Sequence, residues 1–145
     1  MTDAQGHLQR FNYLVGEIDA LYHEAALQFG LPDSAVQVLY TVCVEGDGCG
    51  IGRIIRRCGM SKQTLNSALR RLEAEGAICL KADSGRRKRV CLTETGKALA
   101  ERTVCRLIDI ENGIFEMWTQ EERDGYIGLT QRYLEAFQRG LEALK

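Results

Sequence analysis

Basic side chains are concentrated in the middle third of this 145-residue chain, between positions 50 and 97. That segment holds twelve lysines and arginines against four acids, a net charge of +8, whereas the remainder holds seven cations against sixteen acids, a net charge of −9. The overall charge of −1 conceals this division. A solvated surface normally mixes the two signs, and a cationic face on a folded segment is the usual footprint of a polyanion site, most often for nucleic acid.

Two short helices joined by a tight turn must position many of these cations. Residues 51–58 read as a basic helix with its apolar residues facing inward, and Gly59 supplies a turn. Ser61 is a suitable N-cap for a second helix that ends at Gly76. Because the apolar residues of this second helix recur at intervals of three and four, its polar residues share the opposite face.

The remaining cations lie on a predicted β-hairpin. From 77 to 93 the apolar period changes from helical to two, and the turn signal DSGR separates the two arms. Pairing Ile78 with Leu92 keeps the apolar side chains on one face and places Cys79 opposite Cys91. We therefore expect a hairpin with a basic returning arm and two neighbouring reduced thiols.

Longer helices flank this segment. Apolar residues from Leu8 to Phe29 recur at steps of three and four, a stripe that fits either a buried core or a seam with a partner helix. Asp33 is a good N-cap for a helix through about Val44, and the glycine-rich segment 46–50 reads as a loop.

Two further caps mark the C-terminal part. Thr93 caps a helix that extends to about Trp118. Thr119 and Glu122 then form a capping box that opens a last helix, whose apolar residues again recur at three and four up to Leu144.

Composition and motifs argue against several classes of protein. The longest apolar run is too short to span a bilayer and the N-terminus lacks a signal-peptide layout, so we expect a cytoplasmic protein with no membrane partner. The six cysteines are then expected to be thiols. Zinc-site spacing, nucleophile elbows, P-loops and nucleotide fingerprints are missing from the sequence, which predicts no enzyme, metal or cofactor.

Helix, tight turn, helix and hairpin is the layout of a winged helix–turn–helix, and its second helix carries side chains suited to reading DNA. The major groove admits one helix, where Gln pairs with adenine and Arg with guanine. Basic residues on the first helix and the hairpin suit phosphates or the minor groove. The predicted DNA-binding residues, with Gln63, Asn66, Ser67 and Arg70 nearest the bases, are Arg53, Arg56, Arg57, Ser61, Lys62, Gln63, Asn66, Ser67, Arg70, Arg71, Arg86, Arg87, Lys88 and Arg89.

The segment SKQTLNSALRRLEAEGAI (61–78), followed by RRKRVCLTETGKAL (86–99), resembles the MarR family of bacterial transcription regulators. The shared pattern is a recognition helix ending in R-L-E-x-x-G and a basic wing ending in L-T-x-x-G. The resemblance extends over the entire chain. It implies a homodimer, built from N- and C-terminal helices, that binds double-stranded DNA at a pseudo-palindromic operator, often with release by a small aromatic or anionic effector.

We therefore predict one MarR-like domain over 1–145, mainly α with a small β-hairpin wing. Residues 33–97 form its winged-helix DNA-binding region, 94–118 a connecting helix, and 1–30 and 119–145 the dimerisation helices. Many family wings carry an Asp-Arg pair near the tip, in which the acid braces the arginine. Here that bracing is either absent or supplied by Asp83.

The predicted function is a sequence-specific DNA-binding transcription regulator, a repressor released by a small-molecule effector. Tyr13, Tyr22 and His23 could line an effector pocket, although core or interface packing is the stronger explanation for them. Two alternatives stay open. One is a redox-sensing regulator, for which Cys58 and Cys49 are the best placed thiols. The other is a winged-helix dimer that binds a protein partner and not DNA.

Overall fold

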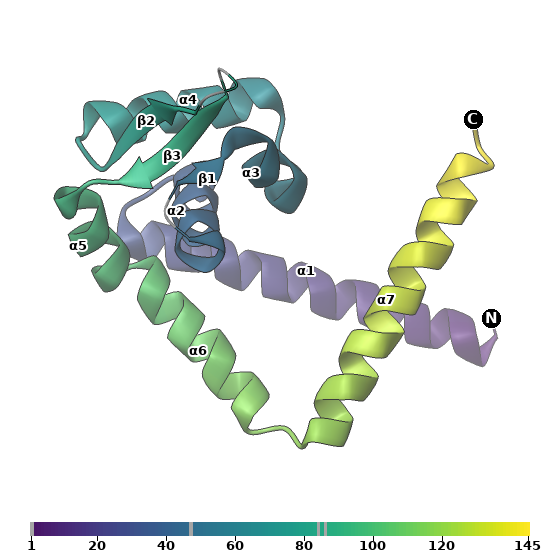
Figure 1. The fold of residues 1–145 in the computed structure, drawn as a ribbon. Coiled ribbons are helices and arrows are strands. Elements are labelled where there is room, and N and C mark those ends of the chain that lie inside the picture. The colour runs from purple at the N-terminus through teal and green to yellow at the C-terminus, as the bar shows by residue number, and fades with distance from the viewer. Residues whose placement is uncertain (1, 47, 84, 86) are drawn as a thin grey trace. The chain divides into compact units, whose positions relative to one another are not determined.

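A computed structural model describes residues 2–46, 48–83, 85 and 87–145 of the chain. Two compact units are distinguished, residues 1–107 and 108–145. The described residues are mainly helical with one small antiparallel sheet, which confirms the predicted fold class. The elements (Figure 1) are α1 (Asp3–Phe29), α2 (Asp33–Glu45), β1 (Cys49–Gly50), α3 (Ile51–Cys58), α4 (Lys62–Ala74), β2 (Ile78–Ala82), β3 (Lys88–Leu92), α5 (Glu94–Arg102), α6 (Val104–Glu116) and α7 (Gln120–Glu142).

The hairpin forms in the predicted register. Ile78 pairs with Leu92 and Cys79 with Cys91, so burial of one apolar face has selected the pairing. The sheet also has a third strand, β1, in a segment that the sequence predicted to be a loop. The strand order is β1-β3-β2, and Cys49 of β1 pairs with Val90 of β3. A two-residue strand beside glycines has no alternation to read, and it exists only through its pairing with β3.

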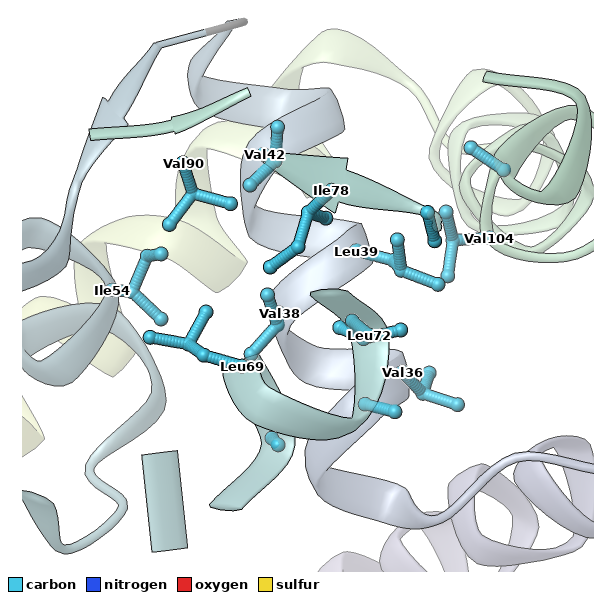
Figure 2. Packing of buried hydrophobic residues seen from close by; sticks show 14 of the residues in the cluster. Val36, Val38, Leu39, Val42, Ile54, Leu69, Leu72, Ile78, Val90 and Val104 are labelled. Carbon is cyan, nitrogen blue, oxygen red and sulfur yellow. The ribbon is translucent and has the colours of Figure 1, made fainter. Parts of the chain in front are cut away.

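The core of the first unit is organised around α2, which contacts α3, α4 and the sheet. Its apolar side chains converge with those of the neighbouring elements (Figure 2). Full burial of one such side chain contributes roughly 1.5–3 kcal/mol, so this cluster sets the positions of α3, α4 and the wing. The largest fully buried side chains are Leu39, Ile54, Leu65, Leu72, Val38, Val42, Val90 and Val104.

Side-chain caps fix the helix starts as predicted at three positions. The Ser61 hydroxyl accepts from the Thr64 N–H at 3.1 Å, and Thr119 forms its capping box with Glu122. The prediction at Asp33 is wrong, because Pro32 occupies the N-cap position and Asp33 is the first helical residue. The Asp33 carboxylate instead lies 2.8 Å from Nδ1 of His23 in α1. Its negative charge is also favourable at the positive, N-terminal end of the α2 dipole.

The third cap joins the end of the α4 segment to the base of the wing. The Thr93 hydroxyl accepts from the Gly96 N–H at 3.0 Å and donates to the Gly76 carbonyl at 2.5 Å. The Thr93 N–H donates to the Ala77 carbonyl at 3.1 Å. A Cβ at Gly96 would lie 1.8 Å from that same carbonyl oxygen, so only glycine fits there. The glycine of the L-T-x-x-G motif therefore permits α5 to approach the chain after α4.

The connecting helix expected over 94–118 is two helices, α5 and α6, separated at Thr103. Thr103 has φ −127° and ψ −93°, and its buried hydroxyl donates to the Leu99 carbonyl at 2.7 Å. In the second unit, Phe115, Trp118 and Tyr126 pack their rings together at the turn before α7. Among the described residues, no helix is long and apolar enough to cross a membrane.

Candidate nucleic-acid interface

The outer face of α4 is polar and uncovered, while its inner face is buried. Leu65, Leu69 and Leu72 recur at helical spacing and anchor the helix on the core. This burial forces the intervening side chains outward. The exposed residues from the predicted set are Ser61, Lys62, Gln63, Asn66, Ser67, Arg70 and Arg71.

Two of these α4 residues already have partners within the chain. The Ser61 hydroxyl donates to the Thr64 hydroxyl at 2.9 Å while it caps the helix. The Arg71 Nε lies 3.0 Å from the Glu75 carboxylate, an exposed pair of the kind that contributes little to stability. Gln63, Asn66 and Arg70 are the remaining long polar side chains suited to base edges.

Asp83 organises the turn of the wing. Its Oδ1 accepts from the Gly85 N–H at 2.8 Å and from the Arg87 N–H at 3.1 Å. These hydrogen bonds, the Gly85 one foremost, hold the pKa of the Asp83 carboxyl below its usual value, and the nearby Arg89 and Arg87 charges add to the effect. Arg86, a predicted DNA-binding residue, lies outside the described residues.

Asp83 also faces an arginine, so it supplies the bracing acid that the sequence left open. Its Oδ2 lies 3.5 Å from Arg89 Nε, and Arg89 Nη1 donates to the Gly48 carbonyl at 2.9 Å. Arg89 thus ties the wing to the segment before β1. Arg87 and Lys88 are exposed beside it.

The three arginines of α3 differ in their surroundings. Arg53 and Arg57 both contact the carboxylate of Glu45, the last residue of α2, at 3.2 and 2.9 Å. Arg56 is exposed. Sequence reasoning missed Glu45 because the residue lies outside the basic segment, and no spacing rule links it to α3.

The predicted effector residues do not gather at one place on α1. Tyr13 and Tyr22 are nine residues apart, which puts them on opposite sides of a helix with 3.6 residues per turn. The Tyr13 hydroxyl donates to Glu17 at 2.8 Å and its ring lies under Arg10. His23 contacts Asp33 and so links α1 to α2.

All six cysteines are free thiols, and two of them have surroundings that disfavour the thiolate. Burial raises the pKa of Cys43 to about 11, with a contribution from the neighbouring Cys105. Burial and the Glu45 charge also raise the pKa of Cys49, one of the two thiols predicted to be best placed for sensing. Within the described part of the chain, no three His, Cys, Asp or Glu side chains gather as a metal site would require.

Comparisons with known proteins match this arrangement. A sequence profile described as the MarR family matches residues 29–89, from the end of α1 into β3. A comparison with curated protein sequences found no match. The winged-helix segment is therefore similar to that of the MarR family of transcription regulators, as its motifs predict.

Solved structures extend the similarity to nearly the whole chain. A MarR family regulator from Neisseria meningitidis superposes with a TM-score of 0.81 at 20% identity, over 96% of this chain and 99% of its own. One from Silicibacter pomeroyi gives 0.67 at 25% identity, over 86% and 84%. The Staphylococcus aureus MepR–DNA complex gives 0.73 at 20% identity, over 94% and 99%. The chain thus has the fold of MarR-family transcription regulators.

Proposed function

We propose that this protein is a sequence-specific DNA-binding transcription regulator whose α4 enters the major groove. The observation that carries the proposal is the exposed polar and basic face of α4, which follows the arginines of α3 and precedes the cationic wing along the chain. Such a face offers hydrogen-bonding groups for base edges, and its flanks offer cations for the phosphates on either side. That a similar fold has been solved as a complex with DNA, in S. aureus MepR, supports the same role.

The protein acts as a homodimer in this proposal. Large apolar side chains of both terminal helices are exposed in the single chain, among them Phe11 and Ile18 of α1 and Leu134 and Phe137 of α7. Monomeric proteins rarely expose apolar surface of this extent, so a second copy is the simplest cover for it. A two-fold dimer presents two copies of α4 and reads a pseudo-palindromic site.

Repression with release by a small molecule is the finer part of the proposal, and it rests on the family resemblance. Effector binding would alter the spacing of the two α4 helices and so weaken DNA binding. The predicted pocket residues Tyr13, Tyr22 and His23 stay a prediction. Redox sensing is the less supported alternative, because burial and the Glu45 charge raise the pKa of Cys49, one of the two thiols best placed for it.

A selection experiment tests the central proposal. The purified protein is mixed with a random duplex library, bound fragments are enriched and sequenced, and binding is measured against salt. A palindromic enriched motif, with affinity that falls steeply as salt rises, is expected. Failure to retain any duplex at low salt would instead support the winged-helix dimer that binds a protein partner.

A further inference from the structure

The contact between Glu45 and two arginines of α3 is not explained by the fold alone. Glu45 ends α2, where the partial negative charge of the helix terminus disfavours a carboxylate. Its Oε2 lies 3.2 Å from Arg53 Nε and its Oε1 lies 2.9 Å from Arg57 Nη1. Arg53 and Arg57 are four residues apart and therefore share one face of α3. One acid thus holds both guanidinium groups at once.

The two arginines keep binding capacity beyond this contact. A guanidinium carries five N–H donors, and Glu45 accepts from one nitrogen of each. The Glu45 side chain is only 19% exposed, whereas those of Arg53 and Arg57 are 58% and 42% exposed. The acid is therefore set inward and the cationic ends are presented outward, where a phosphate oxygen can reach them.

We propose that Glu45 is a positioning residue that holds Arg53 and Arg57 in place to bind DNA phosphates. The proposal rests on the DNA-binding function argued above. A long arginine side chain loses rotamer freedom when it binds, and this loss weakens association. Because Glu45 already restrains both side chains in the free protein, less freedom is lost when DNA arrives.

A different role for Glu45 would have the opposite experimental sign. If the carboxylate competed with DNA for the two arginines, or only added negative charge near the phosphates, its removal would strengthen binding. If it positions them, its removal weakens binding although the protein becomes more positive. The sign of the change therefore separates positioning from simple electrostatics.

The test compares Glu45→Gln with wild type on a fluorescent duplex that the wild-type protein has enriched from a random library, over a range of salt. We expect the variant to bind about three- to tenfold more weakly, from rotamer freedom regained by two side chains. The slope of log Kd against log salt stays unchanged, because the same phosphates are contacted. Glu45→Asp, which keeps the charge but shortens the arm, weakens binding in the same way.

One matched background and one charge control make the result decisive. In Arg53→Ala/Arg57→Ala, the salt slope falls by about two, and adding Glu45→Gln changes nothing more. Glu94→Gln removes an equal charge from an exposed acid and leaves binding equal or tighter. Tighter binding by Glu45→Gln, or an equal loss in the double-alanine background, would overturn the inference. If wild type binds no duplex at all, the proposed function fails along with it.

Discussion

At the scale of single residues, the proposed function divides the α4 side chains into those expected to read bases and those expected to contact the DNA backbone. Arg70 and Lys62 are both exposed cations of α4. Arg70→Ala should cost roughly 1–3 kcal/mol of binding free energy and relax preference at one base pair, since Arg pairs bidentately with guanine. Lys62→Ala should weaken all duplexes alike and reduce the salt slope by about one, as loss of a phosphate contact does. Enrichment sequencing and salt titration of the two variants would check this, and identical profiles would contradict it.

The turn of the wing should depend on pH through Asp83. The pKa of its carboxyl is lowered by the Gly85 N–H first, then by Arg87 and Arg89. A lowered pKa in the folded state means that the ionised carboxylate stabilises the turn above its unfolded pKa, and that this stabilisation is lost as pH falls through the folded pKa. The Gly85 and Arg87 amide signals in NMR spectra should therefore titrate together, with a midpoint below the ordinary aspartate value of about 3.9.

The control for this pH effect is Asp83→Asn, whose amide oxygen can still accept hydrogen bonds but cannot be protonated in this range. Its Gly85 and Arg87 signals should not titrate. A shared midpoint at or above the ordinary value in wild type would show that Asp83 does not hold the turn.

Residue roles were predictable where they follow from local pattern and hidden where they follow from packing. The polar face of α4 could be read from its sequence because the apolar residues fix which side is buried. The roles of Glu45 and Arg89 could not, because their partners lie 8 to 12 and 41 residues away in sequence. The sequence predicted Arg89 only as a DNA-binding cation. In the structure its guanidinium also donates to the Gly48 carbonyl and so connects the wing to the segment before β1.

At the scale of elements, the junction between α5 and the chain after α4 should be sensitive to one methyl group. Gly96→Ala would place its Cβ 1.8 Å from the Ala77 carbonyl oxygen, so backbone must move. Overpacking of this kind typically destabilises by about 1–3 kcal/mol, and the displaced wing should also weaken DNA binding. Thermal or urea unfolding measures the first effect and duplex titration the second.

Gly113→Ala is the matched control for Gly96→Ala. Gly113 lies in α6, and a Cβ there would meet no atom within 4 Å among the described residues. Alanine favours a helix over glycine by about 0.5–1 kcal/mol, so this variant should be as stable as wild type or more stable. Equal stability of the two variants would contradict the close approach at Gly96.

Elements with strong local signals were predicted well, and those that depend on tertiary pairing were not. The caps at Ser61 and Thr119 and the hairpin register follow from side-chain chemistry and alternation. The strand β1 and the separation of α5 from α6 have no such signal. Thr103, where the helix path breaks, is flanked by neither proline nor glycine, and its buried hydroxyl bonds back to Leu99 as it would within a continuous helix.

At the scale of the whole molecule, charge and apolar surface are segregated along the chain. The central +8 segment forms α3, α4 and the wing, and the −9 remainder includes α1 and α7. The terminal helices therefore combine acidic character with exposed apolar stripes. This distribution suits a dimer in which the terminal helices associate and the cationic surfaces stay available to DNA.

Dimerisation can be tested on α7, whose apolar stripe includes Leu134, Phe137 and Leu141. Phe137→Glu places a charge in that stripe, and burying it without a partner is costly. We expect wild type to sediment as a dimer at micromolar concentration and Phe137→Glu to shift toward monomer. Because a monomer presents only one α4, the variant should also lose affinity for the enriched palindromic duplex while keeping weak binding to random duplex.

The control for Phe137→Glu is Arg132→Glu. By its spacing, Arg132 lies on the side of α7 opposite the apolar stripe. Arg132→Glu changes the charge more than Phe137→Glu does and should leave the protein dimeric. Loss of the dimer in Phe137→Glu alone would therefore be caused by disruption of the apolar stripe and not by the added charge.

A dimer needs an apolar seam that two copies can share, and the unfolding midpoint of such a dimer rises with protein concentration. A wild-type midpoint independent of concentration, together with a monomeric sedimentation coefficient, would show that α1 and α7 serve another partner.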